Sequence, residues 1–275
     1  MDGFDPVKYF KGDRPPPAAS VLTSTSKFLN SPLYRDIFSQ FGLRLVGTDV
    51  PNTYLIPDMV RATEEMTDVA RVLAAEKQAK PEFAAWLDKR HLSRWRAEEL
   101  KEHGPGTLGR RIHDFLTQTG MEMDFMSHAV PQSDYEYFKR RRIQDHDIEH
   151  MVTGLNTSPV GEIALIAFNN IAALNYFSPQ FWQEISPGFL FLLTTSLMRA
   201  SLHYPKTVVP YFEGMAIAHK MAMRQKQPFF FTEWEPYLDW TIADIREELH
   251  LTDAPPDGAW ADSYVAEGIA PATAS

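Results

Sequence analysis

The sequence predicts a mainly α-helical protein, built as a single multi-helix domain with loosely ordered N- and C-terminal tails. Helix-start signals recur along the chain, whereas alternating or β-branched runs typical of strands are few. Of the 275 residues, 44% are hydrophobic and 23% are charged, which is an ordinary globular composition. No repeat recurs at a fixed period, so we expect one folded unit.

The domain boundaries follow from proline and glycine at both ends of the chain. Three consecutive prolines end at residue 17, and Pro255, Pro256 and Gly258 precede an Ala- and Ser-rich C-terminus. We therefore predict tails over residues 1–19 and 253–275, around a helical domain that spans residues 20–252.

The first half of the domain is predicted to contain four helices, over residues 33–41, 57–77, 80–90 and 93–103. Ser31 and Pro32 supply a cap and a first-turn proline for the first of these helices, and Pro57 opens the second. One short hairpin is also compatible with the pattern, at no assigned position.

The best-defined helix begins at Ser133, where Ser133 and Glu136 form a capping-box pair, and it is expected to run through residues 151–153 to a stop at Gly154. Ser158 then starts a second helix, to about Tyr176, that is apolar almost all round and should be buried. Further helices are expected over residues 189–202, 208–225 and 245–249, the last after a cap signal at Thr241 and Asp244.

Composition excludes several functions. Lys and Arg total 27 against 36 for Asp and Glu, a net charge of −9, so nucleic acid is not an expected partner. The chain has no cysteine, so any metal must be bound by His, Asp or Glu.

Residues 1–17 lack a secretion or mitochondrial signal, which predicts a cytosolic start. The uncharged stretch 163–183 contains asparagines and a proline, so we expect a buried helix and not a membrane span.

The sharpest motif is His146-Asp147-x-x-His150, followed after eleven residues by Glu162. On a helix, His146 and His150 lie about 40° apart and Asp147 about 100° from His146, so one helix can offer three ligands. Glu162 falls in the first turn of the next helix, and antiparallel packing could return its carboxylate to His150. Two imidazoles and two carboxylates suit zinc or a similar divalent first-row ion.

These residues are also compatible with other interpretations. Glu162 could simply favour the positive end of its helix, with the two histidines on a polar face, but an ionised carboxylate at the head of an apolar helix is costly without a partner. The zincin motif HExxH has Glu where this chain has Asp147, and HD-type phosphohydrolases need further distant ligands. A di-iron bundle needs two Glu-x-x-His elements, and Glu247 with His250 is the only one.

The run from His146 to Gly161-Glu162 resembles the ubiquinone (coenzyme Q) biosynthesis family of the Coq-four type, whose hallmark is HDxxH, eleven residues, then Glu. Residues 106–109, Gly-Thr-Leu-Gly, are similar to another element of that family, and residues 234–249 are similar to its C-terminal end. The resemblance touches most of residues 30–250.

The resemblance implies that His146, Asp147, His150 and Glu162 are metal ligands, for zinc or, alternatively, for cobalt, manganese or iron. It implies a polyprenylated aromatic quinone precursor as ligand, from which the ring carboxylate is oxidatively removed and replaced by hydroxyl. It also implies other ubiquinone-biosynthesis enzymes and a membrane surface as partners. Without a mitochondrial segment, a cytoplasmic protein at the inner face of the bacterial inner membrane is expected.

Catalysis does not follow from the motif alone. The alternative is a non-catalytic scaffold that binds the polyprenyl lipid and organises other enzymes of the pathway, and a third interpretation is a metal-dependent phosphohydrolase. Arg142, four residues before His146, is predicted to bind an anionic substrate near the metal, although a solvated charge run is the alternative. The oligomeric state, including a homo-oligomer, is left open.

Overall fold

The computed structural model describes residues 26–32, 34–35, 38, 64–121, 123 and 130–268. Within these ranges the chain forms helices and no strand, and an isolated antiparallel bridge joins Thr107 to Thr241. The predicted mainly helical fold is confirmed, and the unplaced hairpin has no counterpart in this part of the chain. The predicted tail over residues 1–19 and most of the helix over 33–41 lie outside the described residues.

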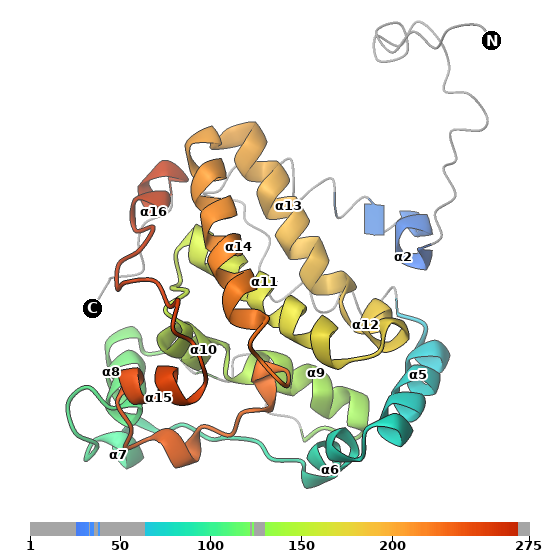
Figure 1. The fold of residues 1–275 in the computed structure, drawn as a ribbon, viewed down its shortest axis with the longest axis horizontal. Coiled ribbons are helices and arrows are strands. Elements are labelled where there is room, and N and C mark those ends of the chain that lie inside the picture. Colours follow the sequence, from blue (N-terminus) through green and yellow to red (C-terminus); the bar gives the residue numbers. More distant parts are fainter. Residues whose placement is uncertain are drawn as a thin grey trace, which may run out of the picture.

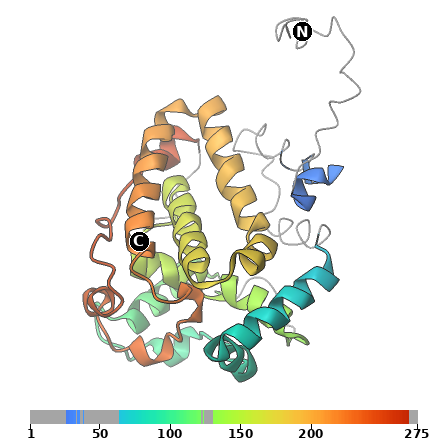
Figure 2. The same ribbon diagram turned by 45° about the vertical axis from the view of Figure 1, so that its right-hand side comes forward.

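The central helix is α11 (Pro159–Tyr176), with α14 (Val208–Ala222) along one side and α13 (Pro187–His203) along the other (Figures 1 and 2). Most residues of α11 are buried, as its apolar sequence predicted. α14 approaches closely at Gly214, where a Cβ would lie 3.0 Å from Val160 Cγ1. The central pair therefore packs with little room for longer side chains at this position.

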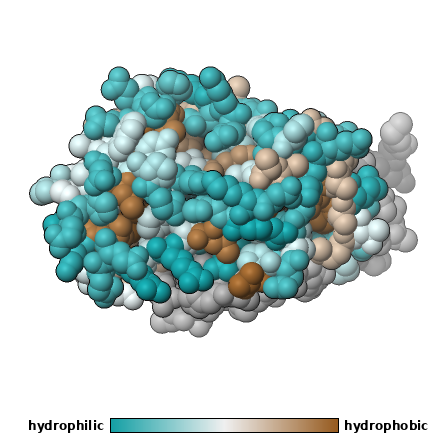
Figure 3. Space-filling model, turned by 90° about the horizontal axis from the view of Figure 1, so that it is seen from below, coloured by the Kyte–Doolittle hydropathy of each residue, from teal (hydrophilic) through white to brown (hydrophobic). Residues whose placement is uncertain are grey.

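Shorter helices surround this layer. They are α2 (Lys27–Asn30), α5 (Met66–Ala79), α6 (Pro81–Lys89), α7 (Ala97–Leu100), α8 (Leu108–Thr119), α9 (Asp134–Gln144), α10 (His146–Thr153), α12 (Pro179–Ile185), α15 (Ile242–Glu248) and α16 (Asp262–Ala266). Figure 1 shows α5 and α6 at one end of the molecule and α7, α8 and α15 at the other, with α9 and α10 between them. Seen from below, this part of the surface is largely hydrophilic (Figure 3).

The predicted helix caps are present. The hydroxyl of Ser133 accepts a hydrogen bond from the Glu136 N–H at 3.2 Å, and that of Ser158 accepts one from Gly161 N–H at 3.1 Å. Thr241 accepts one from Asp244 N–H at 3.2 Å. These bonds satisfy N–H groups that have no partner inside their own helix, so they fix where each helix begins.

The single helix predicted from residue 133 to residue 153 is wrong, because the chain breaks it at Asp145. There the backbone leaves helical geometry, and α9 and α10 are separate helices. The Asp145 carboxylate is buried and accepts hydrogen bonds from Arg141 Nη1 at 2.6 Å and Trp95 Nε1 at 3.1 Å. A tertiary contact therefore redirects the chain just before His146, where the helical pattern of the sequence is uninterrupted.

Other boundaries differ from the prediction. The helix expected over 93–103 is limited to α7, whereas α8 and α12 were not expected although Thr107 and Ser178 cap them. The helices expected over 189–202, 208–225 and 245–249 are α13, α14 and α15. The described chain also continues past residue 252, where we placed the C-terminal tail, and includes α16.

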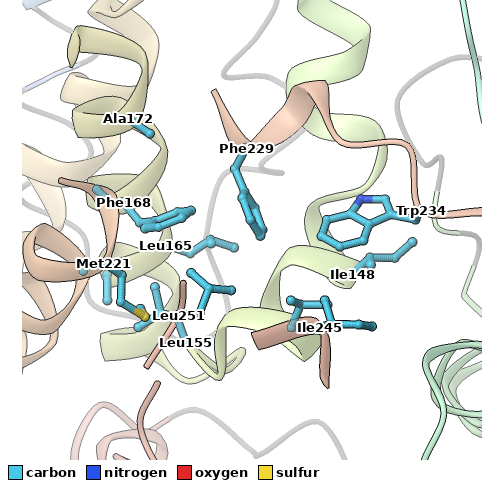
Figure 4. Packing of buried hydrophobic residues seen from close by; sticks show 14 of the residues in the cluster. Ile148, Leu155, Leu165, Phe168, Ala172, Met221, Phe229, Trp234, Ile245 and Leu251 are labelled. Carbon is cyan, nitrogen blue, oxygen red and sulfur yellow. The ribbon is translucent and has the colours of Figure 1, made fainter. Parts of the chain in front are cut away.

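The main hydrophobic core lies against α10 and holds it in place. Ile148 of α10 belongs to one buried cluster with Phe168 of α11, Phe229 and Trp234 from the segment after α14, and Ile245 of α15, and Figure 4 shows it beside Trp234 and Ile245. The buried aromatic side chains of residues 229–231 are thus core residues, as is Trp234, whereas Trp240 is 40% exposed. A second cluster of mostly aromatic side chains joins α5, α6, α9 and α12.

Candidate metal centre

His146 and His150 lie one turn apart on α10, and Glu162 lies in the first turn of α11. α10 ends at Gly154, which adopts a left-handed φ of 73° and donates its N–H to the His150 carbonyl. Ser158 caps α11 with a proline in its first turn. Because both ends of the short connection are fixed, Glu162 faces back toward α10.

Gly161 allows the start of α11 to lie close to this connection. A Cβ at Gly161 would lie 1.9 Å from the backbone oxygen of Asn156 and 2.6 Å from its Oδ1, both far inside van der Waals contact. The same Asn156 Oδ1 accepts a hydrogen bond from Ser158 N–H at 3.1 Å. No residue with a side chain fits at position 161 unless the connection moves, so this glycine sets the position of Glu162.

The three side chains converge with metal-ligand spacing. His146 Nε2 lies 3.4 Å from Glu162 Oε2, and His150 Nε2 lies 3.2 Å from Glu162 Oε1. One ligand atom from each of the three residues falls within 4.8 Å of the others. A tetrahedral ion with bonds of about 2.0–2.1 Å separates its ligand atoms by about 3.4 Å, so the donor set fits a first-row divalent ion.

The ring of His150 is fixed in the tautomer that a metal requires. Its Nδ1 is hydrogen-bonded to the backbone carbonyl of Leu155, which can only accept, so Nδ1 carries a proton and Nε2 is the ring nitrogen that a metal would bind. His150 Nε2 is buried and accepts no hydrogen bond. Buried polar atoms almost always have a partner, so this unsatisfied nitrogen beside a carboxylate supports an ion between them.

Asp147 stands beside the site and not within the group of three. Its Oδ1 lies 3.7 Å from Nδ1 of His146, and its buried Oδ2 has no hydrogen-bond partner. A carboxylate at this ring nitrogen would hold the proton on Nδ1 and leave Nε2 free for a metal. That Asp147 is itself a ligand stays a prediction.

The charges of the site compensate one another in the protein without metal. Burial alone lowers the pKa of His146, but the carboxylates of Glu162 and Asp147 outweigh burial and raise this pKa well above its usual value. Burial alone raises the pKa of Glu162, but His150 and His146 reverse this and hold it far below the usual range. In the protein without metal, a proton on His146 thus supplies the positive charge that a bound cation would supply in its place.

The centre is open on one side. The side chain of His150 is 4% exposed, whereas those of His146 and Glu162 are 24% and 38% exposed. Structural zinc sites are closed by four protein ligands, whereas catalytic sites keep a position for water or substrate. Three convergent ligands with an accessible edge are typical of the second kind.

Arg142 does not contact the three ligand side chains. It is 8% exposed, its Nη1 donates to the Ile185 carbonyl at 2.5 Å, and its guanidinium lies 3.9 Å from the ring centroid of Phe189. Burial lowers the pKa of Arg142 to about 10, opposed by the nearby groups of Tyr135, Glu64 and Glu149. No ion pair among the described residues includes Arg142, so its charge is not paired directly with a carboxylate.

Glu149 received no role from its position in the motif, although it lies between the two histidines. It is 1% exposed, and its Oε2 accepts a hydrogen bond from Asn169 Nδ2 at 2.6 Å. Burial raises the pKa of Glu149 to about 7, while the bond from Asn169 and the charge of His146 act against this rise. The sequence contains a signal for this burial, because Glu149 lies one turn before Thr153 on a helix that packs against the core.

The remaining candidates are peripheral. Glu247 and His250, the only Glu-x-x-His pair, are exposed at the end of α15. In the part of the chain that the structure describes, no second group of His, Asp and Glu meets metal-ligand spacing. Over the same residues, no single helix has the length and apolarity to cross a membrane, although α12 and α13 together do, bent by 64°.

Comparisons with known proteins show which family the chain belongs to. Residues 87–255 match the family described as coenzyme Q (ubiquinone) biosynthesis protein Coq4. The chain is 30% identical over 164 residues to the mitochondrial ubiquinone biosynthesis protein coq-4 of Neurospora crassa, a match that covers 58% of this chain and 42% of that protein.

The fold also resembles a crystal structure of a candidate ubiquinone biosynthesis protein from Nostoc punctiforme. The TM-score is 0.61 at 21% identity, over 82% of this chain and 97% of the other, and this likeness concerns the fold alone. The family match includes both ligand-bearing helices and spans more than half of the 275 residues. The chain therefore belongs to the Coq4 family of coenzyme Q (ubiquinone) biosynthesis proteins.

Proposed function

We propose that this protein acts in ubiquinone biosynthesis as a metal-dependent enzyme, with a divalent ion held by His146, His150 and Glu162 and with Asp147 as a fourth ligand or as the partner of His146. The observation that carries the proposal is the buried, unsatisfied Nε2 of His150, which points at a carboxylate 3.2 Å away. Zinc suits this nitrogen and oxygen donor set, as do cobalt, manganese and iron.

The proposed reaction is the oxidative decarboxylation of a polyprenylated 4-hydroxybenzoate-derived ring. The bond between the ring and its carboxylate breaks and carbon dioxide leaves. A carbon–oxygen bond to an oxygen from water forms, and two electrons and two protons pass to an acceptor, of which dioxygen, reduced to hydrogen peroxide, is the simplest. A bound ion would supply a Lewis acid for the phenolate or carboxylate of the head group.

The protein's own residues would position that head group. The exposed edge at His146 and Glu162 leaves room for a ligand beside the ion, while the buried His150 excludes water from the opposite side. Arg142, which has no carboxylate partner among the residues that the structure describes, is proposed to hold an anionic group of the substrate. Because its guanidinium is stacked on Phe189, it is already ordered for that role.

The test combines metal analysis with turnover. Purified protein, loaded with zinc, cobalt, manganese or iron, is incubated with dioxygen and a short-chain analogue of the ring acid, and mass spectrometry follows the hydroxylated product. Turnover by the wild type and none by His150→Ala supports the enzyme. In a deletion strain, accumulation of the ring acid supports decarboxylation, whereas loss of all late intermediates favours a non-catalytic scaffold.

We also propose peripheral contact with a membrane through the end of the molecule where α13 meets α14. Leu202, Val209 and Phe212 are 61%, 64% and 56% exposed there, an unusual set of large apolar side chains at one turn. The face seen in Figure 3 is largely hydrophilic by contrast. Flotation with lipid vesicles tests this, since Val209→Glu with Phe212→Glu should reduce the bound fraction and leave metal content unchanged.

A further inference from the structure

The C-terminal segment, defined here as residues 257–267, crosses the connection between α10 and α11. Asn156 Nδ2 donates to the carbonyl of Ala259, and the hydroxyls of Thr157 and Tyr264 lie 2.8 Å apart. These contacts are separated by more than 100 residues in sequence, and they touch the connection on the residues just before the α11 cap. The family match ends at residue 255, so the segment lies outside it.

Trp260 anchors the middle of the segment. Its backbone has a φ of 60°, a left-handed conformation that residues with a side chain rarely adopt. Its side chain packs against the cluster that includes Val160 and Ile163 of α11, and its Cη2 lies 3.6 Å from the place of a Cβ at Gly214 of α14. The side chain therefore fills the space between the central helices beside the first turn of α11.

Glu267 anchors the far end. Its side chain is fully buried, and its carboxylate accepts hydrogen bonds from Thr207 at 3.2 Å, Tyr211 at 2.9 Å and Arg199 at 3.1 Å. A buried carboxylate is tolerated because these three donors and the guanidinium charge satisfy it. The segment is thus fixed at both ends of its passage over the connection.

Tyr264 brings the segment to the candidate ligand itself. α16, which carries Tyr264, contacts α11, and the hydroxyl of Tyr264 is held by Thr157, one residue before the α11 cap. Burial raises the pKa of the Tyr264 phenol, the bond with Thr157 opposes this, and the nearby carboxylate of Glu162 adds to the rise. The phenol and the Glu162 carboxylate are therefore within electrostatic reach of each other.

We propose that residues 257–267 are a positioning element of the metal centre, which clamps the connection between α10 and α11 so that Glu162 stays beside His146 and His150. The inference rests on the proposed metal centre. Glu267 is the anchor of the clamp, and it contacts none of the three ligands, so it acts on them through the segment.

The test compares two isosteric substitutions of buried carboxylates. Glu267→Gln removes the charge that anchors the clamp, while the matched control Glu76→Gln does the same to a 2% exposed carboxylate that joins α5 to α12. Affinity is measured by titrating metal-free, full-length protein with Co²⁺ and following the visible spectrum. We expect Glu267→Gln to weaken binding by about tenfold to a hundredfold, as for other residues that orient ligands, and Glu76→Gln to leave it unchanged.

A second measurement does not depend on the metal. Hydrogen exchange of the metal-free protein should become faster for amides of residues 155–161 in Glu267→Gln and not in Glu76→Gln. If Glu267→Gln does not fold, Tyr211→Phe removes one of the three donors to Glu267, and Tyr264→Phe removes the contact with Thr157. Each should weaken Co²⁺ binding by a few-fold.

The outcomes separate the clamp from the proposed function. If wild type binds Co²⁺ and the folded variants of Glu267, Tyr211 and Tyr264 bind it equally well, the clamp is refuted and the metal centre stands. Equal weakening by Glu76→Gln also refutes it, because general loosening would then explain the effect. If wild type binds no Co²⁺, the metal centre fails, and the positioning role fails with it.

Discussion

Two glutamates each join two helices in this protein, and they do so in opposite ways. Glu76, near the end of α5, is 2% exposed and accepts hydrogen bonds from the N–H and the hydroxyl of Ser178 at the start of α12. Glu162, at the start of α11, faces the two imidazoles of α10, and its side chain is 38% exposed.

The difference lies in what remains unsatisfied around each carboxylate. At Glu76 the acceptor oxygens have donors and the helix start has its cap, which completes a structural contact. At Glu162 the neighbouring His150 Nε2 and Asp147 Oδ2 are buried without hydrogen bonds. A complete polar junction stabilises the fold, whereas an incomplete one that solvent can reach indicates a binding site.

The largest expected effect is loss of the metal. His150→Ala removes one of three convergent ligand atoms and Glu162→Gln removes the negative charge of another, so we expect stoichiometric binding of zinc or cobalt to fall below detection by plasma mass spectrometry of dialysed protein. Glu76→Gln, at the structural junction, should keep its metal. Full metal content in Glu162→Gln would remove the distinction between the two carboxylates.

Phe83→Ala should produce the largest loss of stability in the region around Glu76, where an aromatic cluster joins α5, α6, α9 and α12. Phe83 is fully buried and packs against the rings of Phe138, Phe177, Phe181 and Phe231. Truncation should lower the free energy of unfolding by about 3–5 kcal/mol, measured in urea, because it leaves a cavity. Metal content should not change, and a parallel loss of metal would show that the two regions are coupled.

Glu149→Gln should stabilise the protein at alkaline pH. The pKa of Glu149 rises from 4.5 to about 7 on folding, so its ionised carboxylate destabilises the folded protein. This destabilisation is absent below pH 4.5, grows up to about pH 7 and is complete above it. Glutamine keeps an acceptor for Asn169, and the gain at pH 8 should be about 3 kcal/mol. Urea unfolding of both proteins at pH 5 and pH 8 checks this, and an equal difference at both pH values would contradict it.

The smallest effect concerns metal affinity and pH. Because the pKa of His146 is raised, its imidazole is protonated near neutral pH, and a metal must displace that proton. Below that pKa, each unit of falling pH should weaken Co²⁺ binding by about tenfold, and affinity should rise with pH until His146 is neutral. Glu76→Gln should keep this slope, whereas an affinity independent of pH between 6 and 8 would exclude His146 as a ligand.

Local patterns predicted the ligand-bearing helices because each signal lies within a few residues. The caps at Ser133 and Ser158, the stop at Gly154 and the four-residue spacing of the histidines all correspond to contacts in the structure. The meeting of His146, His150 and Glu162 was also predictable, because the short connection between their helices leaves few ways to pack. The bound ion and the reaction stay predictions.

Contacts distant in sequence could not be predicted. The break at Asp145 depends on Trp95, fifty residues away, and nothing in the helical periodicity around residue 145 indicates it. The same holds for the contacts of Arg142 with Ile185 and Phe189, which lie more than forty residues away in the sequence. The C-terminal segment was interpreted from its prolines, although its contacts come from Trp260 and Glu267.

The close approach at Gly161 means that His146, Asp147, His150 and Glu162 together are not a sufficient signature of this candidate centre. A relative with the same histidines and acids but alanine at the equivalent position would have to open the loop, and its glutamate would swing away from the imidazoles. When distant sequences are searched for functional members, the residue without a side chain should therefore be weighted as heavily as the side chains that bind.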